Sequence, residues 1–370
     1  MTNGNHRARP RLLRGRRHVL LVALSAILAL LGALVFTADR RTARQGPLPS
    51  GALAAGQCCA TASPPAAPVS SHIAKPAASP DQDCAVAPAD SIWRTRVDRL
   101  PSHPLSARYV DSIGADQHLH PDFGSGTWEG RPFGIPITRI SPDQATTKVA
   151  FEYADESDPG PYPIPRDARI ENGPDGDGDR HVLLFDRESC KAYELYSAYP
   201  QPGGTWKAGS GAVFDLRSHQ LRPDGWTSAD AAGLPILPGL VRLDDVKTGR
   251  IDHALRITVP RSQAKYVWPA RHQASSDSDT ALPPMGLRLR LKKSVSLDGL
   301  APQARVVAEA LQTYGAMVAD NGSAWYVSGT EDEGWHNEDL ATLGRFTGTD
   351  FEAVDVSGLM VSPDSSRARL

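Results

Sequence analysis

The sequence predicts a mainly β domain with a few helices, arranged as a two-sheet β-sandwich or jelly roll with accessory helices. Glycine and proline are both abundant, with 32 and 31 of the 370 residues, which favours strands and loops over helical bundles. Strand-like runs fill the chain between residues 133 and 291, whereas the clearest helical pattern begins only at residue 302. No internal repeat is visible, and no regular alternation of strands and helices predicts a barrel of parallel strands.

The N-terminus predicts membrane targeting. Residues 1–44 hold nine arginines and one aspartate, and six of these arginines precede the apolar run 19–36. Such a run is either a short membrane span or the core of a signal sequence. We expect an uncleaved anchor, because the best cleavage position, after Ala38, has the bulky Phe36 where a small residue is preferred. Either alternative places the rest of the chain outside the cytoplasm, with the membrane as a partner.

The remaining chain is acidic and divides into three parts. It carries 31 basic and 41 acidic residues, a net charge of −10, which argues against nucleic acid as a partner. Residues 45–86 are rich in Ala, Pro and Ser and predict a flexible linker. Residues 87–358 predict the β-rich domain, and we expect residues 359–370 to be a disordered tail.

Four cysteines are present. Outside the cytoplasm, a disulfide between Cys84 and Cys190 would tie the entrance of the domain to a central strand. Cys58 and Cys59 fall in the linker, where nothing defines a partner. No pair of cysteines has the spacing of a zinc site.

The elements expected in the domain follow from period-two and period-3.6 patterns. In chain order they are a helix at 91–100, strands at 133–137 and 148–153, a hairpin of 181–186 with 192–199, strands at 212–216, 251–259 and 287–291, a helix from 302 to 318, a strand at 324–328, a helix at 337–346 and a strand at 351–356. Pro302 suits the first turn of its helix, and Asn337 is expected to cap the later one. Residues 155–179 form a long acidic loop, of a length that is usually functional or mobile.

The passage 225–259 organises the predicted domain. Pro235 and Pro238 exclude a regular helix and leave an apolar stretch that we expect to be buried against a sheet. The strand after it has an apolar face interrupted only by His253. That histidine is either a satisfied core residue or part of a site, and the pattern leaves both alternatives open.

Four residues are the candidate catalytic groups: Glu194, His253, Asp320 and Asp215. Glu194 lies on a probable central strand, where burial would raise its pKa as a general acid requires. Two carboxylates on either side of a sugar bond are the arrangement of a glycosidase. A histidine with a tyrosine, such as His253 with Tyr193 or Tyr196, would instead suit a polysaccharide lyase.

Aromatic residues next to glycine or proline are the candidate sugar-binding groups, since an exposed ring can stack on a sugar. Those selected are Trp226, Tyr196, Trp268 and Trp325, with core filling as the alternative for each.

Two short motifs resemble metal sites but fall short of them. His118, His120 and Asp122 alternate, yet Pro121 and the glycines after it indicate a loop. Asp175, Asp177 and Asp179 alternate with glycine, but the distal glutamate of a calcium-binding loop is missing. We therefore predict no metal and no cofactor. Signatures of serine hydrolases, zinc proteases and nucleotide-binding loops are also missing.

Several phrases resemble a widespread group of secreted bacterial proteins of unassigned function. They include DRHVLLFD, AAGLPILPGLVR, GRIDHALRITVP, YVWPARH, PPMGLRLRL and YGAMVADNGSAWY, and the likeness spans residues 109–355. This resemblance implies an extracellular β-rich domain and transfers no catalytic role.

Together these observations lead us to expect an extracytoplasmic carbohydrate-active protein, a polysaccharide hydrolase or lyase. The alternative is a non-catalytic module that binds glycan or the cell envelope. The sequence sets neither the substrate nor the oligomeric state.

Overall fold

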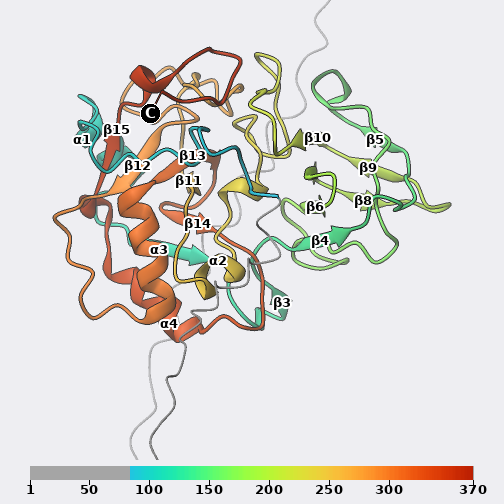
Figure 1. Ribbon diagram of the computed structural model, residues 1–370, viewed down its shortest axis with the longest axis horizontal. Helices are drawn as coiled ribbons and strands as arrows, with labels where there is room; N and C mark the ends of the chain where they lie inside the picture. Colours follow the sequence, from blue (N-terminus) through green and yellow to red (C-terminus); the bar gives the residue numbers. More distant parts are fainter. Residues whose placement is uncertain (1–83, 370) are drawn as a thin grey trace, which may run out of the picture. The chain divides into compact units, whose positions relative to one another are not determined.

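The computed structural model describes residues 84–369 (Figure 1). The predicted anchor at 1–44 and the linker up to residue 83 lie outside these residues. Within residues 84–369, none of the helices has both the length and the apolar character needed to cross a bilayer. Cys84 and Val86, expected at the end of the linker, are buried.

The described chain is rich in strands, as predicted, with few helices. The helices are α1 (Ser106–Ile113), α2 (Leu243–Lys247), α3 (Pro302–Thr313) and α4 (Asn337–Ala341). The strands are β1 (His120–Asp122), β2 (Thr127–Trp128), β3 (Arg131–Pro132), β4 (Ile137–Ile140), β5 (Val149–Phe151), β6 (Val182–Asp186), β7 (Lys191–Tyr196), β8 (Tyr199–Pro200), β9 (Trp206–Ala208), β10 (Ser210–Asp215), β11 (Leu255–Val259), β12 (Arg288–Leu291), β13 (Ala316–Asn321), β14 (Tyr326–Ser328) and β15 (Phe351–Val354). They form sheets of six, four, three and two strands rather than a closed barrel, and this arrangement does not confirm a sandwich or jelly roll.

The six-stranded sheet holds the largest core. Its order is β1-β14-β11-β13-β12-β15, and the strands run partly parallel and partly antiparallel. β11 and β13 are parallel neighbours, and the chain between them passes through β12 and then α3, which packs against β12. Parallel neighbours require such a crossover because a tight turn cannot join them.

The two faces of this sheet differ in chemistry. Cross-strand partners share a face, so Leu255, Ala316 and Leu289 lie together on one face, all fully buried. The opposite face carries Arg256 and Arg288, which are also buried. A buried arginine requires partners for its guanidinium, and this second face is therefore where the polar chemistry of the fold collects.

The smaller sheets form around the hairpin predicted from the sequence. β6 and β7 pair antiparallel, β10 extends the sheet beside β7, and β4 lies parallel to β6 on the other side. The strand expected at 133–137 is found later, as β4. Gly134, with φ of +102°, packs so closely on the backbone around Glu331 that residues 133–136 follow that segment instead.

The helix predicted to reach residue 318 ends at Thr313, and residues 316–321 form β13. Gly315 adopts a φ of +66°, and a Cβ there would lie 2.2 Å from the Leu289 carbonyl oxygen. The apolar stripe at 314 and 318 therefore belongs to two different elements. The later helix is also shorter than expected, with α4 followed by a 3-10 turn, and Asn337 does not cap it but bonds Ser125.

Both ends of the domain differ from expectation. Residues 91–100 form turns rather than a helix, and the carbonyls of Ile92 and Val97 accept hydrogen bonds from Arg288 and Arg290. The C-terminal segment, expected to be disordered, makes β-bridges at Ser365 and at positions 367 and 368. The bridge between Ser91 and Arg367 holds the two ends of the described chain together.

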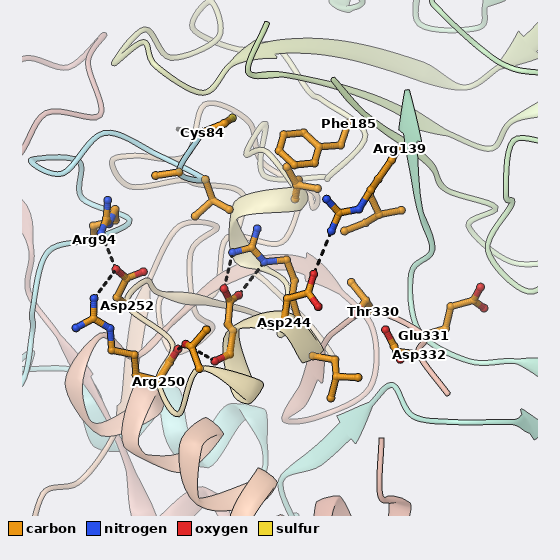
Figure 2. Close-up of a pocket in the computed structure, with 18 of the residues that line it drawn as sticks. Cys84, Arg94, Arg139, Phe185, Asp244, Arg250, Asp252, Thr330, Glu331 and Asp332 are labelled. Carbon is orange, nitrogen blue, oxygen red and sulfur yellow. Dashed lines mark hydrogen bonds and ion pairs between the residues drawn. The ribbon is translucent and has the colours of Figure 1, made fainter. Parts of the chain in front are cut away.

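A pocket of about 760 Å³ opens beside α2, at the edge strand β4 and the segment that follows β14 (Figure 2). Its walls carry arginine and acidic side chains. One rim of this pocket is formed by residues 84–86, next to a disulfide.

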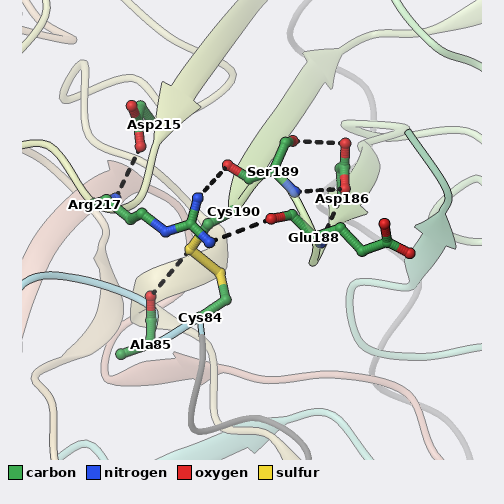
Figure 3. Close-up of a disulfide and its surroundings, with 8 residues drawn as sticks. All are labelled: Cys84, Ala85, Asp186, Glu188, Ser189, Cys190, Asp215 and Arg217. Carbon is green, nitrogen blue, oxygen red and sulfur yellow. Dashed lines mark hydrogen bonds between the residues drawn. A yellow bond between two sulfur atoms is a disulfide. The ribbon is translucent and has the colours of Figure 1, made fainter. Parts of the chain in front are cut away.

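A disulfide joins Cys84 to Cys190, the pairing predicted from the sequence (Figure 3). Cys190 closes the turn between β6 and β7. Asp186 holds this turn, because its carboxylate accepts hydrogen bonds from the backbone N–H groups of Glu188 and Ser189, each at 3.1 Å. The disulfide thus ties the start of the described chain to a turn that is already well supported.

Candidate functional site

Polar side chains from four adjacent strands share one face of the six-stranded sheet. The strand registers place on that face His120 and Asp122 of β1, Tyr326 and Ser328 of β14, Arg256 and Thr258 of β11, and Asp320 of β13. An irregularity in the register between Ile257 and Thr258 brings Asp320, rather than Ala319, opposite Thr258. The sheet therefore assembles acid, base and hydroxyl groups that lie far apart in the sequence.

Arg256 is the buried centre of this face. Its Nε and Nη2 atoms donate to the two carboxylate oxygens of Asp230, each at 3.0 Å, and its Nη1 donates to the Ser328 hydroxyl at 2.6 Å. The carboxylate of Asp320 lies 3.5 Å from Nη2. Burial alone would lower the pKa of Arg256, but the charges of Asp230 and Asp320 outweigh burial and raise it.

A second buried cation, His181, lies next to this centre. Its Nδ1 is 2.7 Å from the Glu171 carboxylate and its Nε2 is 3.1 Å from the Ala229 carbonyl oxygen. Both partners can only accept hydrogen bonds, so both ring nitrogens carry a proton. Burial opposes the charge, but Glu171 overcomes it and raises the pKa of His181 to about 9.

Asp320 and Asp122 are two carboxyl groups of this region that reach solvent, and Asp179 is exposed as well. The Asp320 side chain is 22 % exposed. Burial and the negative charge of Asp230 raise its pKa to about 7, against the opposing effect of Arg256. Asp122 is exposed as a whole residue, but its carboxyl group has lost part of its hydration, and this raises its pKa. The negative charge of Glu171 raises the pKa of Asp122 further.

We name this set the carboxylate cluster. It consists of Asp122, Glu171, Asp179, Asp230 and Asp320 around Arg256 and His181. Its charges act on one another. The pKa values of Asp122, Asp230 and Asp320 are raised and that of Glu171 is lowered, and of the three raised groups Asp122 and Asp320 reach solvent. Carboxyl groups whose surroundings separate their pKa values are the arrangement that acid–base catalysis uses.

Glu194, a predicted catalytic residue, lies behind the cluster and is fully buried. Its two carboxylate oxygens accept hydrogen bonds from the backbone N–H groups of Ile236 and Leu237, at 2.8 and 2.9 Å. Burial raises the pKa of Glu194 to about 7, as expected for that strand, although these bonds oppose the rise. Its position fastens the proline-rich passage to β7 and gives a substrate no access to it.

His253 and Asp215 lie away from the cluster. His253 is fully buried just before β11, not on the strand, with Nδ1 3.0 Å from the Ala254 carbonyl and Nε2 3.5 Å from Asp245. It supports Asp245, which lines the pocket beside α2. Asp215 ends β10 in an exposed position and accepts a hydrogen bond from the backbone of Arg217. The structure thus brings only Asp320 of the four predicted catalytic residues to the solvent-facing part of the cluster.

Of the four predicted sugar-binding aromatic residues, one lies at the cluster and three lie elsewhere. Tyr196 lies at the cluster, and its pKa is raised by burial and by the charges of Asp179 and Asp320. Trp325 is core, with its ring on Phe351 and its Nε1 donating to a backbone carbonyl. Trp268 donates to the Ser365 carbonyl, and Trp226 lies against the Arg222 guanidinium, so both hold loops together.

Three other aromatic side chains are exposed on segments that bond to those supplying the cluster. Trp128, Tyr153 and Tyr199 are 71, 47 and 44 % exposed. Trp128 is on the β2–β3 hairpin, where Arg131 pairs with Asp177 in the loop that supplies Glu171 and Asp179. The Arg180 guanidinium lies 4.3 Å from the centre of the Tyr199 ring. The backbone N–H of Tyr153 donates to the carbonyl of Gly209, whose own N–H donates to the carbonyl of Tyr196.

Sequence reasoning missed Arg256, Asp230 and His181, although one signal was present. A charged residue at an inward position between buried apolar strand residues predicts a buried ion pair, and Arg256 between Leu255 and Ile257 fits that rule. His120 and Asp122 were considered only as metal ligands. Within residues 84–369, no group of three or more His, Cys, Asp or Glu is placed to hold a metal ion.

No protein-family model, curated protein or solved structure matches the chain.

Proposed function

We propose that the protein is an extracytoplasmic carbohydrate-active hydrolase in which Asp320 and Asp122 form the acid–base pair that cleaves a glycosidic bond. The observation that carries this proposal is the position of the exposed aromatic rings. Among residues 84–369, the exposed large apolar side chains are Trp128, Tyr153, Tyr199 and Val361. The three aromatic ones lie on segments that bond to those supplying the cluster: Tyr199 against Arg180, which precedes His181, and Trp128 on the hairpin whose Arg131 pairs with Asp177. Rings exposed beside carboxyl groups suit a sugar, whose C–H faces stack while its hydroxyls bond.

The chemistry of the pair supports hydrolysis. A glycosidase needs one carboxyl group that is protonated when it meets the leaving oxygen and a second that activates water or attacks the sugar. Asp320, with a pKa raised to about 7, is protonated in neutral or mildly acidic solution and fits the first role. Asp122 lies on the same face of the sheet, and we assign it the second role, which requires it to be ionised at the working pH although burial raises its pKa.

A lyase is less well supported, because it needs a base beside the sugar ring. His181 holds protons on both nitrogens, and its two acceptors occupy them. Tyr196 has a raised pKa, the opposite of what a tyrosine base requires.

The non-catalytic glycan-binding module is the second candidate. The observation that favours it is that Glu194 and His253 are internally hydrogen-bonded and fully buried. Under this alternative, the carboxylate cluster joins the sheets and the exposed rings alone contact the glycan.

The test is release of reducing ends by the full-length protein across a panel of neutral and acidic polysaccharides, with Asp320→Asn and Asp122→Asn beside it. We expect each variant to lose at least about a hundredfold in rate, the usual contribution of a general acid or base. Wild-type activity should fall as the pH rises above about 7, where Asp320 loses its proton. Asp111→Asn, on the exposed side of α1, is the matched control and should keep full activity.

The outcomes separate the candidates. Activity that survives both substitutions in folded protein contradicts the assigned pair. A panel without any product, together with retention of the protein on a glycan column that Trp128→Ala abolishes, supports the binding module instead.

A further inference from the structure

The pocket beside α2 is lined by residues that all lie outside the carboxylate cluster. Figure 2 shows side chains that line it from the N-terminal segment, from β4, from α2 and from the segment after β14, with the Arg139 guanidinium extended toward Asp244. Its volume, about 760 Å³, falls within the range of sites that bind small molecules, roughly 300–1,000 Å³.

Five arginines line this pocket: Arg94, Arg139, Arg169, Arg242 and Arg250. Each has an acidic partner. Arg242 binds Asp245 through two nitrogens, at 2.8 and 3.0 Å. Arg94 donates to Asp252 at 2.6 Å, and Arg250 lies 3.7 Å from the same carboxylate.

The acidic residues of the lining equal the arginines in number: Asp244, Asp245, Asp252, Glu331 and Asp332. The lining is therefore rich in charge but close to neutral as a whole. A ligand with a large net charge of either sign would meet as many like charges as opposite ones, so the charge balance favours an uncharged ligand.

The ion pairs keep hydrogen-bonding capacity for such a ligand. A guanidinium has five N–H donors and a carboxylate about four acceptor positions. Within the described residues, Arg242 uses two of its donors on Asp245, and Arg94 uses one on Asp252. A hydroxyl group both donates and accepts, so it can bond to a pair of this kind without separating the two charges.

An apolar part of the lining completes the match. Ile137, Phe185 and Leu243 line the same space, and Phe185 lies beside Arg139 in Figure 2. Sugars present C–H groups on their ring faces and hydroxyls at their edges, so they fit a wall that alternates apolar and paired charged side chains.

We infer that this pocket binds an uncharged sugar residue or short oligosaccharide, at a place separate from the carboxylate cluster. The sugar hydroxyls bond to the arginine–carboxylate pairs of Arg242 with Asp245 and of Arg94 with Asp252. The site holds sugar whether or not the cluster cleaves it, so its test can be read without any hydrolysis.

The experiment is isothermal titration calorimetry on the full-length Asp320→Asn protein, so that turnover is removed. The probes are cellohexaose, maltohexaose and xylohexaose, with a hexamer of galacturonate as the charged comparison. We expect at least one neutral oligosaccharide to bind. Thr248→Trp, which fills the pocket from the exposed end of α2, should weaken that binding at least tenfold, and Thr248→Ala should change it less than twofold.

Trp128→Ala separates this site from the exposed aromatic residue Trp128, because it should leave the Thr248-sensitive binding in place. The inference is overturned if none of the neutral oligosaccharides binds, if only the galacturonate hexamer binds, or if Thr248→Trp binds as tightly as its parent. Failure of the hydrolysis assay leaves these binding results unaffected, so the two proposals fail independently.

Discussion

The cluster and the pocket use the same residue types in different settings. In the cluster, Arg256 and Asp230 are 4 and 1 % exposed and meet through two parallel hydrogen bonds. In the pocket, the side chains of Arg139 and Asp244 are 56 and 55 % exposed and meet through one bond at 3.0 Å. Burial decides what each pair does, because it removes the water that would otherwise compete for the same bonds.

This difference separates two tasks. A buried ion pair whose hydrogen bonds are all formed has one geometry. The Arg256–Asp230 pair can therefore hold Asp320 and Ser328 at fixed positions for a reaction. Separating or reorienting the two side chains of an exposed ion pair costs little free energy, so such a pair can adapt to the hydroxyl groups of a ligand. The cluster is therefore a rigid arrangement of charges, and the pocket is an adjustable one.

The strongest test of this comparison is to break the buried pair. Asp230→Ala leaves the Arg256 guanidinium buried without its main counter-ion, and we expect the free energy of unfolding to fall by about 3–5 kcal/mol. Urea denaturation followed by circular dichroism measures this loss. A fall below about 1 kcal/mol would show that water or Asp320 replaces Asp230 and that the pair is not the centre of the cluster.

The matched control replaces both partners. Asp230→Leu with Arg256→Met removes the two charges together, and such replacements of buried pairs are often neutral or stabilising. We expect the double variant to regain most of the lost stability. Its hydrolytic activity should still be lost, because Arg256 no longer balances the charge beside Asp320.

A second test uses pH. The pKa of His181 is raised to about 9 in the folded chain, against about 6.5 when unfolded. Its contribution to stability is fully present below about pH 6.5 and is lost as the pH rises through about 9. The shift corresponds to about 3 kcal/mol. Asp320, with its pKa raised to about 7, acts in the same direction as the pH rises from about 4 to 7.

Unfolding free energies measured in urea between pH 5 and 9.5 check this prediction, and they should decrease across the range. His181→Gln should remove most of the slope above pH 7. A wild-type stability that rises over that interval would contradict the assignment of His181 as a buried cation.

The sequence was sufficient for elements whose pattern is local. The β6–β7 hairpin, β12, the start of α3 and the disulfide follow from alternation, from Pro302 and from the cysteine positions. It was not sufficient for β13, because the apolar residues at 314 and 318 fit a helical stripe, and only the close approach of Gly315 to Leu289 separates helix from strand. Such contacts are set by tertiary packing, which period alone does not report.

In the candidate site, too, the local sequence pattern predicts some features, and tertiary packing sets the others. Burial of Glu194 and its raised pKa could be expected from a central strand, but its two backbone donors come from Ile236 and Leu237, which the sequence does not place beside it. Asp320 and Asp122 lie on one face because β13, β11, β14 and β1 are neighbours in one sheet. Strand order joins residues some 200 positions apart, and no spacing in the sequence encodes it.

The smallest expected effect is at the pocket. Asp244→Ala removes the partner of Arg139, but both side chains are more than half exposed, so we expect the unfolding free energy to change by less than about 1 kcal/mol. Part of that change reflects the loss of a negative charge from the first turn of α2, where it meets the positive end of the helix. Urea denaturation at low salt and in 1 M NaCl separates these weak terms, since salt should remove most of the difference between wild type and variant. A loss of 3 kcal/mol that persists in salt would mean that the pocket pairs are as structural as the cluster, and the rigid and adjustable regions would no longer be distinct.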